Sequence, residues 1–130
     1  MKVEVHPGYA LLTIAYLAGI AWLSSIPDLG VSSGDPLAQL ASNLFHIPLY
    51  AGLTFCLLRT ISAGTARAKL PWVLSGFTLL ATGTYAALDE WHQSFVPGRY
   101  ASPSDFLLDL LGILAMLLVL RLEAPGEEDS

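Results

Sequence analysis

Ionisable and hydrogen-bonding side chains concentrate in one short segment of the chain, residues 89–99, with the sequence DEWHQSFVPGR. The segment supplies two carboxylates, an imidazole, an amide and a guanidinium: Asp89, Glu90, His92, Gln93 and Arg99. An imidazole next to carboxylates is a common arrangement for general acid–base chemistry. A guanidinium offers a planar fork of donors that fits a phosphate or a carboxylate. The segment therefore predicts acid–base chemistry on an anionic group, or recognition of such a group.

Two further pairs of residues extend the candidate site. His46 and Tyr50 are four residues apart, and so are Asp105 and Asp109, so each pair would share one face of a helix. We expect four residues to act as catalytic acids or bases: His46, Asp89, Glu90 and His92. We expect five others to bind the substrate: Tyr50, Gln93, Arg99, Asp105 and Asp109.

Several of these residues also have a purely structural interpretation. Asp105 fits the acidic position of a capping box that begins at Ser102. Arg99 can pair with Asp105, His46 can be a hydrogen-bonded histidine between helices, and His92 can be a solvated loop residue. The sequence leaves these alternatives open.

Metal ligation is a further alternative for part of the segment. Asp89, Glu90, His92 and Asp105 carry ligand atoms for a divalent cation that would bridge to a phosphate. No fixed ligand spacing such as His-Glu-x-x-His occurs. We therefore assign no residue to a metal and leave the cofactor open.

The rest of the chain is apolar enough to form membrane helices. Hydrophobic residues make up 54% of the 130 residues, charged residues only 13%, and the mean hydropathy is +0.58. Four apolar runs stand out, at residues 9–23, 44–58, 72–88 and 106–120. With their weakly polar flanks each can cross a hydrocarbon core of about 30 Å as a helix. We predict an all-α, integral membrane four-helix bundle that packs through small residues: Gly19, Gly52, Gly76, Gly83 and Gly112.

The positions of the basic residues predict the orientation of this bundle. After four crossings, five of the six basic residues fall on one face: Lys2, Arg59, Arg67, Lys69 and Arg121. Only Arg99 falls on the other. Because cytoplasmic loops carry the excess of Lys and Arg, both termini should be cytoplasmic and loops 24–43 and 89–105 should face outward. The domain prediction is a cytoplasmic N-terminus (1–8), a transmembrane domain (9–122) and an acidic disordered tail (123–130).

This topology brings scattered polar residues to the same depth. His46 begins the second helix, Asp89 and Glu90 end the third, and Asp105 begins the fourth, all at the outer surface. Ionisable groups near hydrocarbon usually face the bundle interior or an aqueous cavity. We therefore expect these residues to converge on one pocket.

Local signals refine the helix boundaries. Ser42 and Asn43 are candidate caps for the second helix, which would place Pro48 near its first turn. Ser102 is a candidate N-cap of the fourth helix, with Pro103 at its first position. Cys56 lies in an apolar run and is expected to be buried. The aromatic residues beside the helix ends are expected to anchor them at the membrane surface: Trp22, Trp72, Trp91, Phe95 and Tyr100.

Residues 89–99, followed by an Asp and a helix containing Gly112, resemble the signature of the VanZ-like family. The His46-x-x-x-Tyr50 pair and the Ser24-Ser25-x-Pro27 segment resemble its other blocks, and the resemblance spans about residues 10–122. It implies a small multi-helix bacterial membrane protein, whose namesake is associated with resistance to the glycopeptide teicoplanin.

Two departures from the family pattern bear on the site. The family often has Asn where this chain has Asp109, and an Asp-Lys pair where it has Ser42 and Asn43. The first departure adds a negative charge and the second removes a cation, so any shared site would be more acidic here.

Two hypotheses about function follow. The first is an enzyme or ligand-binding site at the outer leaflet that acts on a phosphate-bearing anionic lipid or cell-wall precursor. The second is a non-enzymatic membrane module whose polar segment locks the helices together.

A transporter would need the repeats or broken helices that this sequence does not show. The expected partner is the lipid bilayer and not nucleic acid, because the net charge is -5 and there is no basic stripe. The oligomeric state is left open.

Overall fold

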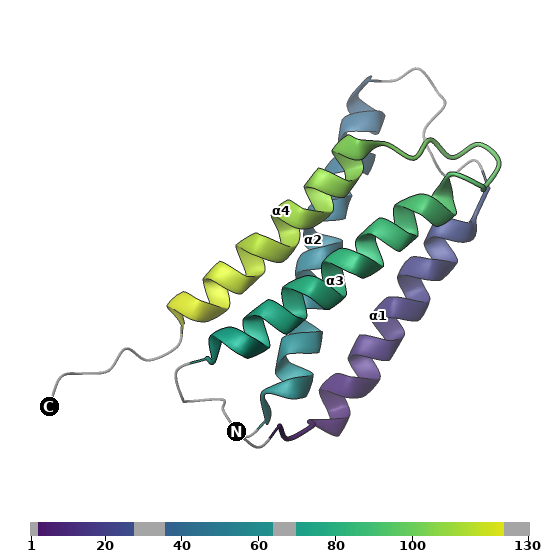
Figure 1. The fold of residues 1–130 in the computed structure, drawn as a ribbon. Helices are drawn as coiled ribbons and strands as arrows, with labels where there is room; N and C mark the ends of the chain where they lie inside the picture. Colours follow the sequence, from purple (N-terminus) through teal and green to yellow (C-terminus); the bar gives the residue numbers. More distant parts are fainter. Residues whose placement is uncertain (1–2, 28–35, 64–69, 124–130) are drawn as a thin grey trace, which may run out of the picture.

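Four antiparallel helices form the protein, as the computed structural model in Figure 1 shows. The structure describes residues 3–27, 36–63 and 70–123. The helices are α1 (Pro7–Ser25), α2 (Pro36–Ile61), α3 (Trp72–Gln93) and α4 (Pro103–Leu122). The described residues contain no strand. The predicted all-α four-helix bundle is therefore confirmed.

α2 and α3 each pack against the other three helices, and the most extensive contact in the bundle is between α2 and α4. Two glycines allow these contacts. A Cβ atom on Gly112 of α4 would overlap the backbone carbonyl of Ile47 in α2. A Cβ atom on Gly52 of α2 would overlap the Tyr16 side chain of α1. Close backbone approach at small residues is the usual way in which helices associate without large side chains between them.

The other predicted packing glycines behave differently. A Cβ atom on Gly83 would make an ordinary contact with Leu110 of α4. A Cβ atom on Gly19 or Gly76 would meet nothing within 4 Å. The prediction that all five glycines mediate helix packing is therefore wrong for Gly19 and Gly76.

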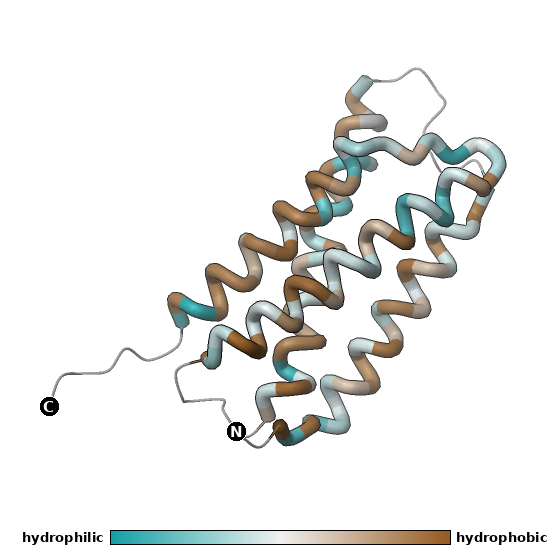
Figure 2. The backbone as a smooth tube through the Cα atoms, in the orientation of Figure 1, coloured by the Kyte–Doolittle hydropathy of each residue, from teal (hydrophilic) through white to brown (hydrophobic). Residues whose placement is uncertain are grey.

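The interior of the bundle is unusually polar and its outside unusually apolar. Among the described residues, twelve buried side chains are polar or charged and only nine are hydrophobic. Large hydrophobic side chains are exposed on all four helices, including Leu11, Leu80 and Leu107. Figure 2 shows hydrophobic residues along every helix and the most hydrophilic residues near helix ends and in the α3–α4 loop. This is the reverse of the distribution in a water-soluble bundle.

Smaller apolar clusters complete the interior. One is centred on Ile20, Tyr50, Leu53, Ala86 and Ile113, and a second on Leu58, Leu74 and Leu120. Cys56 is buried, as predicted.

Two helix boundaries differ from the sequence-based expectation. α2 begins at Pro36, so Ser42 and Asn43 lie inside it and are not caps, and Pro48 lies in its interior. Proline fits the first helical position, and the alanines and leucines that follow are strong helix formers, which explains the earlier start. α3 continues to Gln93, so Asp89 and Glu90 lie in its last turns as predicted, and His92 and Gln93, which were expected in the outward loop, also belong to the helix. Ser102 caps α4 by accepting a bond from the Ser104 N–H, as predicted.

The four helices alternate in direction, so their ends meet in two groups (Figure 1). At one end the His6 N–H, just before α1, donates to the Thr60 carbonyl in α2 at 2.9 Å. At the same end Arg121 of α4 donates to Ser75 of α3 at 3.1 Å. Arg59 also lies at this end, and Arg99 lies at the other. The remaining basic residues and most of the predicted acidic tail lie outside the described residues: Lys2, Arg67, Lys69 and residues 124–130.

Replacing Gly112 tests the close contact of α2 with α4. We expect Gly112→Ala to destabilise the protein by about 1–3 kcal/mol, because the new methyl group meets backbone that cannot move aside without shifting a helix. Thermal unfolding of the purified protein, followed by circular dichroism, measures the effect. Gly76→Ala is the matched control, and its melting temperature should be unchanged or higher because alanine is the better helix former. Equal melting temperatures for the two variants would contradict this account of the contact.

Candidate functional site

Asp89 is the centre of a hydrogen-bond network that joins three helices. Its carboxylate is 7% exposed and lies near the end of α3. Ser24 of α1 donates to one oxygen. Tyr50 of α2 and Gln93 of α3 donate to the other, at 3.3 Å and 3.1 Å. Three donors around one buried carboxylate stabilise its charge, because each replaces a bond that water would otherwise supply.

His46 and Asp109 form a second buried pair beside the Asp89 network. The His46 Nδ1 lies 2.7 Å from one oxygen of Asp109, which is fully buried in α4. Their bond joins α2 to α4. Because Asp109 orients the imidazole from one nitrogen, the other nitrogen is held in a defined direction, as in sites that use histidine as an acid or base.

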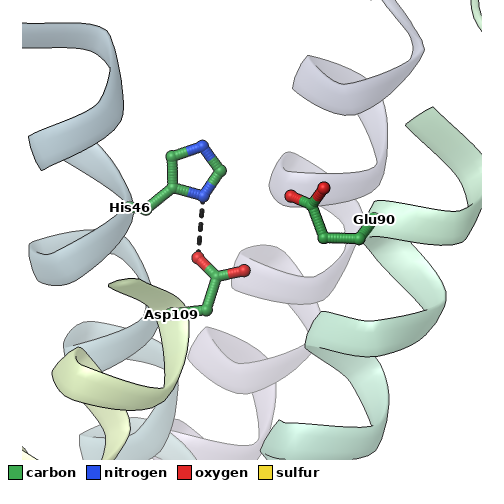
Figure 3. A group of neighbouring side chains, drawn as sticks. All are labelled: His46, Glu90 and Asp109. Atoms are coloured by element: carbon green, nitrogen blue, oxygen red, sulfur yellow. Dashed lines mark hydrogen bonds and ion pairs between the residues drawn. The ribbon is translucent and has the colours of Figure 1, made fainter. Parts of the chain in front are cut away.

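Glu90 completes a compact group with this pair. One Glu90 oxygen accepts the Ser102 N–H at 3.2 Å. The other Glu90 oxygen and the second oxygen of Asp109 are buried and have no partner among the described residues. Ligand atoms of His46, Glu90 and Asp109 all lie within 4.8 Å of one another (Figure 3). Two full negative charges at that separation would repel by about 3.5 kcal/mol at an effective dielectric constant of about 20.

Arg99 ties the α3–α4 loop to the end of α1. Its Nε donates to the Ile26 carbonyl at 3.2 Å, and a terminal nitrogen donates to the Leu23 carbonyl. The last carbonyls of a helix lack partners within it and carry its partial negative charge, so a guanidinium is a favourable cap. The predicted alternative of an Arg99–Asp105 ion pair does not occur in the part of the chain that the structure describes.

A pocket of about 110 Å³ lies between these groups. Its wall comes from α1, α2, α3 and the α3–α4 loop and combines apolar side chains with a carboxylate, an imidazole and a guanidinium. The lining residues are Ile20, Leu23, Ser24, Ser42, Phe45, His46, Leu49, Asp89, Gln93 and Arg99. The pocket is larger than the ~30 Å³ that one water molecule takes up in the liquid. It therefore has room for a small polar group such as a phosphate.

The structure brings together seven of the nine predicted site residues: His46, Tyr50, Asp89, Glu90, Gln93, Arg99 and Asp109. His92 is the first exception, because it is exposed and its Nε2 lies 3.0 Å from the Ser25 hydroxyl, outside the pocket. Asp105 is the second, because it is only half-buried and does not line the pocket. Nor does Asp105 complete a capping box, since the Ser102 N–H donates to Glu90 instead.

Ser24 belongs to the site but was not among the site residues predicted from the sequence. It is 3% exposed, bonds to Asp89 and lines the pocket. The available signal was the pair of serines at the end of the first apolar run, which stood out only through its resemblance to the VanZ-like pattern.

Four helices with an apolar outer surface and a polar pocket at one end define a class of small α-helical bundles. Within that class the chain belongs to the VanZ/LLP1 family, because the model of this family matches residues 6–123. The resemblance found in the sequence is thus confirmed over nearly the whole chain. No curated protein and no solved structure matches the chain.

Substitutions at Asp89 test whether its network stabilises the bundle. Asp89→Leu should lower the free energy of unfolding by about 1–3 kcal/mol, because the buried Tyr50 hydroxyl loses its acceptor. Ser24 and Gln93 keep other acceptors, the Ile20 carbonyl and the Ser24 oxygen. Asp89→Asn should cost less, since an amide keeps one acceptor oxygen. Thermal unfolding measures both. Glu123→Gln, an exposed change at the opposite end of the bundle, is the control and should alter the free energy of unfolding by no more than about 0.5 kcal/mol. A large loss in the control, or none in Asp89→Leu, would contradict this role.

Proposed function

We propose that the protein is an integral membrane protein with four spans that binds the polar headgroup of a phosphate-bearing lipid or cell-envelope precursor in its outer pocket. The observation that carries the proposal is the pocket itself. Ionisable side chains from two helices and a loop converge there, although charged residues make up only 13% of the chain.

The distribution of apolar residues supports membrane insertion. Two helical segments, Pro7–Ser25 and Leu40–Ile61, are long and apolar enough to cross a membrane by length and composition. α3 and α4 do not meet the same criterion of length and composition for a membrane span. These are the two helices that carry the carboxylates of the site. Their exposed surfaces are nevertheless apolar, with Leu80, Leu107 and Leu118 all more than half exposed. Large hydrophobic side chains exposed on every helix are unfavourable in water and favourable in lipid.

The positions of the arginine residues support the proposed orientation. Arg59 and Arg121 lie at the end of the bundle opposite the pocket, and Arg99 lies beside the pocket. Under the positive-inside rule the pocket faces outward and both termini are cytoplasmic.

The pocket wall suits a ligand that carries both a negative charge and hydrogen-bond donors. Arg99 uses two of its N–H groups on backbone carbonyls, which leaves others for an anionic oxygen. Asp89 and His46 also line the pocket and carry acceptor atoms. A phosphate that bears hydroxyl or amino substituents, as in lipid headgroups and cell-wall precursors, combines these features. If the ligand is a cell-wall precursor, the protein would also affect the response to glycopeptides such as teicoplanin.

A second function is supported by the Asp89 network. Its three donors come from α1, α2 and α3, so it fixes these helices relative to one another whether or not a ligand binds. The protein would then be a structural or partner-binding membrane module. The first function predicts that the pocket binds a phosphate-bearing lipid, and the second does not require any such binding.

Cysteine labelling tests insertion and orientation. In a Cys56→Ala background, Pro97→Cys should react with an impermeant maleimide on intact spheroplasts, because Pro97 is exposed in the α3–α4 loop. Val5→Cys, at the other end of the bundle, is the matched control and should react only after permeabilisation. The reverse pattern would invert the orientation. Recovery of the protein in the soluble fraction would exclude insertion.

Titration of a soluble lipid tests headgroup binding. Dihexanoyl phosphatidylglycerol, whose phosphate bears a hydroxylated headgroup, should bind the purified protein saturably, whereas dihexanoyl glycerol, which lacks the phosphate, should not. Arg99→Lys should weaken binding about tenfold or more, because lysine keeps the charge and loses the planar fork. Isothermal titration calorimetry measures both. Arg59→Lys at the opposite end is the control and should bind normally. Equal binding of the two lipids, or an Arg99→Lys variant that binds normally, would favour the structural function.

A further inference from the structure

We propose that His46, Glu90 and Asp109 bind one divalent transition-metal ion, of the class that includes Zn²⁺ and Mn²⁺. The three residues come from α2, α3 and α4, so the ion would hold three helices together at the pocket end of the bundle.

The first support is geometric. Each residue offers a ligand atom within 4.8 Å of the other two. Figure 3 shows the carboxyl groups of Glu90 and Asp109 and the Nδ1 side of the His46 ring all turned toward the space between them. Zinc bonds to nitrogen and oxygen are about 2.0–2.2 Å long, so two ligand atoms of a tetrahedral site lie about 3.4 Å apart. The three side chains would therefore draw closer together, by about 1 Å, to close the site around an ion.

The second support is independent of this spacing. Oε1 of Glu90 and Oδ2 of Asp109 are buried and lack a hydrogen-bond partner in the described part of the chain. Their side chains are more than nine-tenths buried, at 8% and 0% exposed. Buried carboxylate oxygens are rarely left unpartnered, because desolvation without a replacement bond is costly. A cation between the two oxygens would satisfy both.

The ligand types select the class of ion. One imidazole and two carboxylates suit Zn²⁺, Mn²⁺ or Fe²⁺, whereas Mg²⁺ and Ca²⁺ favour sites made of oxygen ligands alone. Two carboxylates also balance the charge of a divalent ion. Glu90 is held in place by the Ser102 N–H on its other oxygen, the kind of outer contact that orients a metal ligand.

Nearby charges agree with a cation at this position. Asp105 and Asp89 add negative charge around the group. Arg99 is the basic residue next to the pocket, and its guanidinium is bonded to carbonyls at the end of α1. Within the described residues, no lysine or arginine side chain therefore lies between Glu90 and Asp109.

The metal site does not depend on headgroup binding. His46 lines the pocket, but Glu90 and Asp109 do not, so the ion would lie behind the pocket wall. Metal binding can therefore be measured with no lipid ligand present. Loss of headgroup binding with metal binding retained, or the reverse, would separate the two proposals, so either can fail while the other holds.

The test is a titration of the purified full-length protein after removal of metals with a chelator and dialysis. We expect one Zn²⁺ per chain by elemental analysis, a micromolar or tighter Kd by calorimetry, and a melting temperature that rises with Zn²⁺ concentration. Because His46 must be neutral and Glu90 and Asp109 ionised to bind a metal, any proton that neutralises this group in the metal-free protein should be released on loading. His46→Gln, Glu90→Gln and Asp109→Asn should each weaken binding at least tenfold. His92→Gln, which removes an exposed histidine, is the matched control and should bind normally.

A spectroscopic measurement covers the case in which a variant fails to fold. Co²⁺ added to the unmodified protein should give visible absorption bands typical of four- or five-coordinate cobalt with nitrogen and oxygen ligands, and excess Zn²⁺ should remove them. Absence of saturable Zn²⁺ binding by the unmodified protein would overturn the proposal. So would Zn²⁺ binding that survives in folded forms of all three variants.

Discussion

Burial of carboxylates inside an apolar bundle is the constraint on which the rest of this structure depends. Asp89, Glu90 and Asp109 lie within the helices and are at most 8% exposed. A charged group taken from water must recover its lost hydrogen bonds from the protein. For Asp89 the donors come from three different helices, so satisfying one carboxylate fixes the relative positions of α1, α2 and α3. Hydrogen bonds to Asp89 therefore specify the arrangement of helices at the polar end of the bundle together with the apolar cluster around Tyr50.

Backbone packing and the polar groups reinforce each other between α2 and α4. Gly112 lies one turn after Asp109, and Ile47 directly follows His46. Because Gly112 lets the α4 backbone approach the Ile47 carbonyl, the two helices come close enough for the His46–Asp109 bond of 2.7 Å. A larger residue at position 112 would separate the helices next to this bond. The glycine thus positions the site as well as the fold.

The apolar runs predicted the number and order of the helices, since long uncharged segments leave few alternatives. They did not predict which face of α3 points inward. The sequence predicted that the third helix ends at Asp89 and Glu90, so the positions after them had no assigned helix face, and His92 was grouped with Asp89. In the structure α3 continues to Gln93, so Asp89, Glu90 and Gln93 share the buried face and His92 lies on the other side. The partners of Asp89 were also out of reach, because contacts between distant helices leave no local pattern.

The charge balance at the pocket end follows from where the chain places its cations. Arg59 and Arg121 lie at the opposite end of the bundle, and Arg99 is bonded to carbonyls of α1. Glu90 and Asp109 therefore face each other without a described basic side chain between them. A protonated His46 offsets one of their two charges at most. The remaining charge needs a proton or a cation from outside the chain, so the electrostatic state of this end responds to what the protein binds.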